Sequence, residues 1–144
     1  MSVSLKCQYG LRALFELAKR KGSGPVRIQE IAAAQALPER FLENILNQLR
    51  RGGFVDSRRG KAGGFVLAKL AEHITILEIV QFLEGPLYTF DCEGIDPIKK
   101  CPLGPDCVFM PLWRKAREAL ESVYRETTLQ DLLHAETTPH SFDI

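Results

Sequence analysis

Three cysteines stand close together in a segment that is rich in proline and glycine. Cys92, Cys101 and Cys107 follow the spacing C-x8-C-x5-C, and residues 85 to 108 also hold four of the eight prolines and three of the eleven glycines. A long irregular segment in a small protein is often functional. Thiolates are the usual ligands of iron-sulfur clusters, whereas most structural zinc sites use paired C-x2-C motifs, which this segment lacks. The spacing favours an iron-sulfur cluster over zinc, with free or disulfide-forming thiols as the alternative.

Three thiolates leave such a cluster one ligand short. The histidines His73, His134 and His140 all lie outside the cysteine segment, and we expect them at the surface. Met110 lies three residues after the last cysteine of the segment, but a thioether is a weak donor. Cys7 is a candidate if the segment of one subunit reaches the first helix of another, although a lone cysteine on an apolar helix is more often buried. The residues alone leave the fourth ligand open.

A second group of chemically suited side chains lies on one face of a predicted helix that begins at Pro38. Its apolar residues recur at helical spacing: Leu42, Ile45, Leu46 and Leu49. Its polar residues fall on the opposite side: Arg40, Glu43, Asn44, Asn47 and Arg51. Asparagine can pair with adenine, arginine with guanine, and a carboxylate can accept from cytosine. The face suits base reading in DNA, and a merely solvated helix face is the plain alternative.

A basic, glycine-rich hairpin follows this helix. Gly52 and Gly53 end the helix, and two short strand-like runs, residues 54 to 55 and 65 to 67, bracket the tip. The tip carries Arg58, Arg59 and Lys61 between glycines, which permit close backbone approach. A slim arginine tip suits a narrow, electronegative minor groove. A polar-faced helix followed by such a hairpin is the layout of a winged helix-turn-helix, whose helix enters the major groove.

The remaining pattern predicts the helices that position these groups. Apolar periodicity and caps predict helices over residues 5 to 21, 28 to 35, 76 to about 84, 111 to 125 and 128 to 133. The fourth helix begins at a capping box formed by Thr75 and Glu78. The long helix from residue 111 has an apolar stripe, Leu112, Ala116, Leu120 and Val123, which suggests pairing with a second copy. We expect a frayed tail from His134.

The expected fold is therefore mainly α with a small β-hairpin wing: a winged helix-turn-helix plus a long C-terminal dimerisation helix. We divide the chain into a DNA-binding domain over residues 1 to 84, a cysteine-bearing sensor loop over residues 85 to 108, and a dimerisation helix with the C-terminal tail over residues 109 to 144. A chain of 144 residues with 45% hydrophobic content is long enough to bury a core.

Charge is distributed unevenly along the sequence. Residues 1 to 70 carry 13 lysines and arginines against 5 acidic residues, a balance of +8, whereas residues 71 to 144 carry 6 against 13, a balance of −7. The net charge of +1 hides this asymmetry. A basic half is typical of a surface that meets a polyanion such as duplex DNA.

The sequence lacks the patterns of a membrane protein, a secreted protein or an enzyme. Lys6, Arg12 and Glu16 interrupt the apolar pattern of the first helix, and no segment approaches the roughly 20 apolar residues that span a bilayer. We expect a cytoplasmic protein. No C-x2-C motif, nucleotide-binding loop or partnered His/Asp set is present, so an enzyme or redox carrier is disfavoured. A module whose winged helix docks a partner enzyme is the other alternative.

The sequence also resembles the Rrf-two family of bacterial winged-helix transcription regulators, which includes iron-sulfur regulators of the IscR and NsrR type. The matching residues are Tyr9-Gly10-Leu11-Arg12-Ala13-Leu14 in the first helix, Phe41-Leu42-Glu43 with Leu46 and Leu49-Arg50 in the third, Arg59-Gly60 with Gly63-Gly64-Phe65 in the wing, and the cysteine loop leading into Pro111-Leu112-Trp113. The wing and the cysteine loop together make the resemblance specific.

The resemblance implies a homodimer that binds promoter DNA, and we expect it to act as a repressor. It implies that Cys92, Cys101 and Cys107 hold a two-iron or four-iron cluster near the dimer interface, and that Glu43, Asn44 and Arg59 contact DNA. Members with a histidine ligand place it where this sequence has Met110. Members that recruit a carboxylate from the partner's first helix place it at Gln8. The alternative is a cluster-free member regulated by thiol oxidation, a zinc ion or a partner protein.

Overall fold

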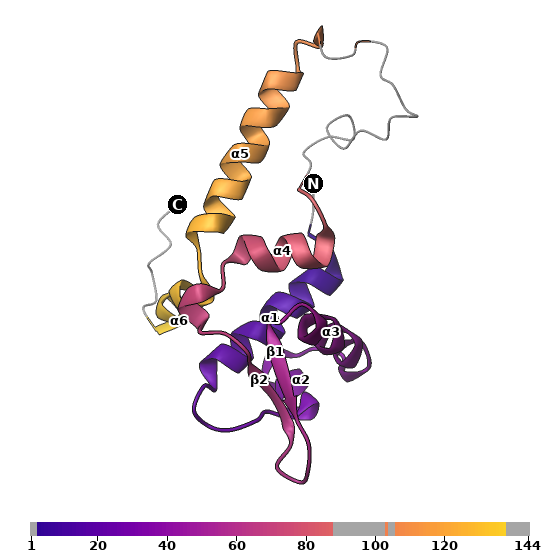
Figure 1. Ribbon diagram of the computed structural model, residues 1–144, viewed down its shortest axis with the longest axis vertical. Coiled ribbons are helices and arrows are strands. Elements are labelled where there is room, and N and C mark those ends of the chain that lie inside the picture. Colours follow the sequence, from indigo (N-terminus) through magenta and orange to yellow (C-terminus); the bar gives the residue numbers. More distant parts are fainter. Residues whose placement is uncertain (1–2, 88–102, 104–105, 138–144) are drawn as a thin grey trace.

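The computed structural model describes residues 3 to 87, 103 and 106 to 137. These residues form α1 (Leu5–Lys19), α2 (Ile28–Gln35), α3 (Glu39–Arg51), β1 (Val55–Arg58), β2 (Gly64–Leu67), the 3-10 helix η1 (Ala71–His73), α4 (Ile76–Glu84), α5 (Met110–Glu126) and α6 (Leu129–Thr137). α1 to α4, α6 and the hairpin pack together, and α5 extends away from them (Figure 1). The mainly helical fold with a small antiparallel hairpin confirms the expected fold class.

α1 is the central helix of the packed body. It contacts α2, α3, α4, α6 and β2. It begins after Ser4, whose hydroxyl accepts a hydrogen bond from the Cys7 N–H at 3.1 Å. Gly10 lets α4 approach closely, because a Cβ at this position would lie 2.5 Å from Leu83 Cδ1. The helix ends at Lys19, two residues before the end that the sequence predicts.

The core lies between α1, α3 and α4. The apolar face of α3 is buried as its spacing predicts: Leu42, Ile45, Leu46 and Leu49 are each at most 3% exposed. Full burial of an aliphatic side chain of this size contributes about 1.5 to 3 kcal/mol. Hydrophobic burial therefore fixes which face of α3 points inward, and it leaves the polar face outside.

α4 starts where the capping box predicts. The Thr75 hydroxyl accepts from the Glu78 N–H at 3.2 Å, and the Glu78 carboxylate accepts from the Thr75 N–H at 2.9 Å. The helix ends at Glu84, and Gly85 then adopts a φ of +86°. α4 therefore leads directly into the cysteine segment.

α5 ends in a tight connection that returns the chain to the body. The Ile76 N–H donates to the Thr127 carbonyl at 2.9 Å, and the Leu129 N–H donates to the Ile74 carbonyl at 3.0 Å. Leu129 is fully buried. α6 continues to Thr137, so it is longer than predicted and the expected fraying does not begin at His134.

Within the described residues, no helix is both long and apolar enough to cross a membrane.

Candidate functional site

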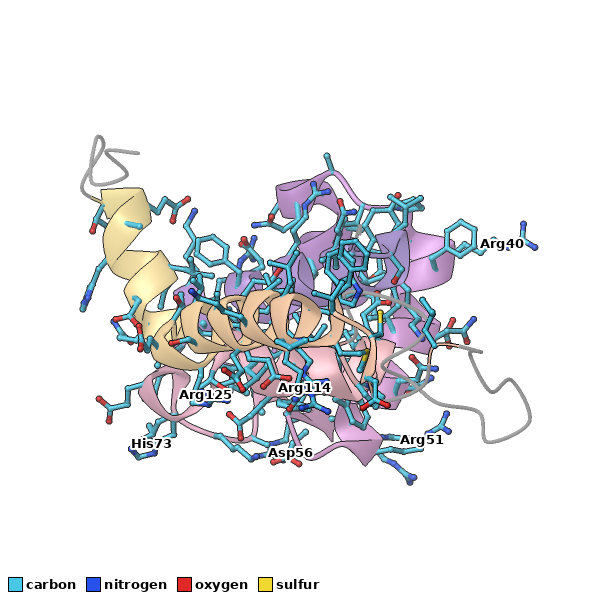
Figure 2. The ribbon with its side chains drawn as sticks, turned by 90° about the horizontal axis from the view of Figure 1, so that it is seen from above. Arg40, Arg51, Asp56, His73, Arg114 and Arg125 are labelled. Atoms are coloured by element: carbon cyan, nitrogen blue, oxygen red, sulfur yellow. The ribbon has the colours of Figure 1, made fainter. Side chains whose placement is uncertain are left out.

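The polar face of α3 points away from the core. Arg40, Glu43 and Asn44 are exposed, and Asn47 is half-buried. Figure 2 shows the side chains of Arg40 and Arg51 directed away from the body of the molecule. The four candidate DNA-contacting residues of α3 therefore lie on a face that is open to a partner.

The hairpin, which we call the wing and define as residues 55 to 67, carries the other candidate contacts. β1 and β2 are antiparallel, and Arg58 pairs with Gly64 at the end of the ladder. Arg58 is therefore part of a strand rather than of the tip, because β1 extends three residues beyond the run that the sequence predicts. Arg59 and Lys61 lie in the turn beyond the ladder, and all three basic side chains are exposed.

The turn at the wing tip requires glycine. Gly60 has a φ of +104°, and its carbonyl accepts from the Gly63 N–H at 3.0 Å. A Cβ at Gly63 would lie 2.5 Å from the Arg58 carbonyl oxygen and 2.8 Å from that of Gly60. The tight turn therefore holds Arg59 and Lys61 at the end of a short, stiff hairpin.

Two hydrogen bonds that the sequence did not reveal connect the wing to α2 and α3. The Arg27 guanidinium, at the start of α2, donates to the Lys61 carbonyl in the tip. The Arg50 Nη1, near the end of α3, donates to Ser57 Oγ at 3.2 Å. Both arginines are visible in the sequence only as surface cations, since their partners lie 34 and 7 residues away. The wing and α3 are thus linked directly.

A buried carboxylate fixes α2 against α1. Glu16 is 4% exposed, and it accepts hydrogen bonds from Arg20 Nε at 2.7 Å and from Gln35 Nε2 at 2.8 Å. Burial alone would raise the pKa of Glu16, but the hydrogen bonds from Gln35 and Arg20 outweigh it and lower the pKa from its ordinary value. Arg12 donates to the Gln35 carbonyl from the same helix. This network positions the helix that precedes α3.

Of the three cysteines in the sensor loop, the structure describes only Cys107. Cys92 and Cys101 lie outside the described residues. Cys107 is half-buried and lies three residues before α5, and its carbonyl accepts from the Met110 N–H at 3.1 Å. Among the described residues, no three histidine, cysteine or acidic side chains are grouped so that they could hold a metal ion.

The candidate fourth ligands differ in their surroundings. Cys7 is fully buried. Burial, followed by repulsion from Glu84, raises the pKa of its thiol to about 11, so in this fold it packs as an apolar residue. Gln8 is exposed, and its side-chain amide donates to the Val3 carbonyl at 2.8 Å. Met110 is half-buried at the start of α5, beside Cys107 in the chain.

Comparison with known proteins shows which family has this combination of helices, wing and cysteines. The model of the Rrf2 family, described as iron-dependent transcriptional regulators, matches residues 3 to 135. The chain belongs to the Rrf2 family. The family resemblance predicted from the helix, wing and cysteine-loop motifs is thereby confirmed. Members of this family are DNA-binding transcriptional regulators rather than enzymes.

Several Rrf2 relatives match over almost the entire chain. CymR of Bacillus subtilis, an HTH-type transcriptional regulator, is 38% identical over 92% of this chain and 89% of its own. Its solved structure, described as that of the global cysteine regulator, has a TM-score of 0.77 at 37% identity and covers 96% of this chain and 98% of that chain. The structure of T. potens IscR has a TM-score of 0.74 at 33% identity, and the match covers 94% of this chain and 88% of that chain. The repressor NsrR of Streptomyces coelicolor is 34% identical over 90% of this chain and 86% of its own.

Proposed function

We propose that this Rrf2-family regulator acts as a repressor, reads promoter DNA through α3 and the wing, and is controlled by its cysteine segment. The observation that carries the DNA-reading part is the division of α3 into a fully buried apolar face and an open polar face. Residues 1 to 84 form the DNA-binding domain in this proposal, residues 85 to 108 the sensor loop, and residues 109 to 144 the dimerisation part.

The chemistry of the two elements suits the two grooves of DNA. Arg40, Asn44 and Asn47 on α3 offer groups that pair with purine edges, and Glu43 can accept from cytosine. The wing presents its basic residues, Arg58, Arg59 and Lys61, at the end of a narrow hairpin, which suits phosphates or the minor groove. The contacts from Arg27 and Arg50 hold the wing relative to the helices.

Alanine variants on the reading surface test this assignment. In titrations of a duplex from the protein's own promoter, we expect Asn44→Ala and Arg59→Ala each to lose about 1 to 3 kcal/mol of binding free energy. Arg125→Ala removes an exposed arginine from the acidic half, and it should leave the affinity nearly unchanged. Unchanged binding by both reading-surface variants would show that α3 and the wing are not the DNA interface.

The proposed control rests on the donor set of the sensor loop. Three thiolates, from Cys92, Cys101 and Cys107, suit an iron-sulfur cluster, and the family is described as iron-dependent. Such a cluster would supply a redox-active, charged group at this place. Cys107 is half-buried and lies three residues before α5, with its carbonyl bonded to the Met110 N–H, so we expect a change at its thiol to affect the start of that helix. The fourth ligand would come from Met110, Gln8 or Cys7, and the burial of Cys7 argues against it.

A cluster-free mode of control is the second candidate. Its specific support is the likeness to CymR of Bacillus subtilis, which is described as a global cysteine regulator. In this mode the thiols are oxidised directly, or the regulator responds to a zinc ion or a partner protein. The DNA-reading surface is the same in both modes.

Anaerobic purification separates the two modes. If a cluster is present, wild-type protein is coloured and contains iron and acid-labile sulfide, whereas Cys107→Ser loses most of both because one thiolate ligand is missing. Ala119→Ser, a conservative change on α5, serves as the control and should retain the wild-type content. Colourless, iron-free wild-type protein would exclude the cluster and leave direct thiol control.

We further propose that α5 mediates a homodimer. Within the described chain, no residue of α5 is buried. Leu112 and Val123 are 53% and 61% exposed although both are large and apolar. A second copy that packs on this stripe would cover it, and it would also provide two reading heads for the repeated half-sites of an operator.

A further inference from the structure

A cavity opens on the side of the wing that faces the end of α1. It has a volume of about 400 Å³ and lies between the last turn of α1, the loop that follows it, and the outer edge of β2 with the segment after it. This volume is within the range of small-molecule sites. Leu17 and Val26, both at most 4% exposed, contribute apolar walls, together with Phe65.

The hydrogen-bond pattern of the hairpin leaves the backbone N–H and carbonyl of one residue of β2, Leu67, open on the edge that lines this cavity. Asp56 pairs with Val66, Arg58 with Gly64, and the Ala68 N–H donates to the Phe54 carbonyl at 3.0 Å. Antiparallel partners alternate between pairs that exchange hydrogen bonds and pairs that do not. The even-numbered residues of β2 therefore bond to β1, and the odd-numbered residues face the opposite edge.

On that opposite edge, only part of β2 has a partner. Phe65 exchanges two hydrogen bonds with Val26, at 2.9 and 2.8 Å. Leu67 would pair with Gly24 if the strand pairing continued, but the chain has turned away at Gly24, where φ is +81°. The N–H and carbonyl of Leu67 have no hydrogen-bond partner among the residues that the structure describes.

The charge around the cavity is positive. Arg20, Lys21 and Lys69 line it, and none of the described lining residues is acidic. Arg20 directs its Nε to the buried Glu16, and the Lys69 ammonium lies 5.2 Å from the centre of the Phe54 ring. Lys21 is exposed at the rim. An occupant therefore meets apolar walls, the open backbone N–H and carbonyl of Leu67, and a cationic rim.

We propose that this cavity binds a small amino-acid-like anion, namely a molecule with a carboxylate, an amide group and an apolar side chain. Its amide N–H donates to the Leu67 carbonyl, and one of its carbonyl oxygens accepts from the Leu67 N–H, as a paired residue on a third strand would. Its carboxylate lies toward Lys21, and its side chain contacts Leu17 and Val26. Such an occupant extends the sheet at the base of the wing.

None of the described residues that line the cavity belongs to the cysteine segment or to the polar face of α3. The site would give the regulator an input that acts on the wing directly, because β2 connects Leu67 to the basic tip. Ligand binding at this cavity is independent of how the cysteines are used, and it can be measured without DNA.

The test is a nuclear magnetic resonance titration of the full ¹⁵N-labelled chain with N-acetyl-L-leucine. We expect saturable shifts of the Leu67 and Gly24 amides, with a dissociation constant in roughly the millimolar range. The neutral N-acetyl-L-leucine amide should bind more weakly, because it lacks the carboxylate. Absence of shifts at these amides, or equal binding of the two compounds, would overturn the proposal.

A matched pair of charge variants checks the position of the carboxylate. Lys21→Gln removes the rim cation and should weaken binding by about three- to five-fold, the effect of one partly exposed charge. Lys115→Gln removes an exposed lysine from α5, and it should bind like the wild type. Equal weakening in both variants would show that the acid responds to net charge and not to this cavity.

One further ligand shows whether the cavity binds the C-terminus of a peptide or a free acylated amino acid. An acetylated tetrapeptide that ends in leucine with a free carboxylate carries the same terminal groups. Binding of the peptide as tight as that of N-acetyl-L-leucine would support the site and assign it to a peptide terminus. Rejection of the peptide, with N-acetyl-L-leucine still bound, would support the site and assign it to a free acylated amino acid.

Discussion

At the scale of single residues, the carboxylate of Glu16 shows how one buried charge can position a binding surface. Its hydrogen bonds from Arg20 and Gln35 join α1 to the end of α2, directly before the connection to α3. Periodicity places residue 16 on a helix, but it does not show that an acidic side chain is buried, because the amide that stabilises it lies 19 residues away.

The lowered pKa of Glu16 predicts a dependence of stability on pH. Because the pKa in the folded state is below the ordinary value of 4.5, the stabilisation is fully present above about pH 4.5 and is lost as the pH falls through the folded-state value. We expect Glu16→Gln to lower the free energy of unfolding by about 1 to 2 kcal/mol at pH 7. The difference from the wild type should shrink in acid.

Urea unfolding of both proteins at pH 7 and at pH 4 or below measures this difference. Glu118→Gln changes an exposed glutamate of α5 and serves as the control. A Glu16→Gln variant as stable as the wild type at neutral pH would mean that the buried carboxylate contributes no net stability.

Cys7 and Cys107 differ in how far their side chains are buried. Cys7 and Cys107 are both thiols on or beside helices, and sequence alone leaves both open as ligands. Burial separates them, because Cys7 is fully enclosed with a pKa of about 11, whereas Cys107 is half-buried. Tertiary packing of α1 against its neighbours determines the burial of Cys7, which no local pattern encodes.

At the scale of elements, local patterns were sufficient for most helices and for the wing. The buried stripe of α3 and the capping box at Thr75 are local signals, and both lie in the structure where the sequence places them. The length of β1 was underestimated, because Asp56 and Arg58 are polar and their strand conformation comes from pairing with β2. α6 also extends beyond its predicted end, where Glu136 forms an exposed ion pair with Lys19 at 3.0 Å.

The wing also depends on a feature that no local pattern reveals. A Cβ at Gly64 would lie 2.4 Å from the carbonyl oxygen of Val26, so this glycine permits the segment before α2 to pair beside β2. The sequence indicates a glycine-rich turn, but the partner of Gly64 lies 38 residues earlier. The φ of +153° at Gly64 and this close approach together explain the glycine.

The exposed apolar stripe of α5 leads to a prediction about assembly. Val123→Glu places a charge on the proposed dimer face, where burying it without a partner is costly, and should raise the dimer dissociation constant by roughly ten-fold or more. Lys115→Glu changes an exposed polar position of the same helix and should have little effect. Analytical ultracentrifugation distinguishes the two. Unchanged association of Val123→Glu would place the dimer interface elsewhere.

At the scale of the whole molecule, the sequence is divided between a basic half and an acidic half. The balance of +8 over residues 1 to 70 accompanies the reading helix and the wing, and the balance of −7 falls on the later segments. Figure 1 shows α5 leaving the body at the opposite side from the wing tip. This arrangement supports the proposal that the end with the wing binds DNA and that α5 forms the dimer.

We expect α4 to connect the two ends, because it contacts both α1 and α5. Leu83 of this helix packs against Gly10, and the Phe82 ring would contact a Cβ at Gly52 at 2.6 Å. The rings of Phe82 and Phe54 lie 5.4 Å apart between centroids. α4 therefore contacts Gly52 and Phe54, in the short connection between α3 and the wing, and it is followed directly by the cysteine segment.

The most direct test of the central claim is the affinity for promoter DNA before and after oxidation of the cysteine segment. Anaerobically prepared wild type and Cys107→Ser are titrated into a fluorescent duplex from the protein's own promoter, and each titration is repeated after exposure to air. We predict that the wild-type dissociation constant changes by about ten-fold or more, a typical coupling between two sites, while that of Cys107→Ser stays constant. An unchanged wild type, or an equal change in the variant, would contradict the account.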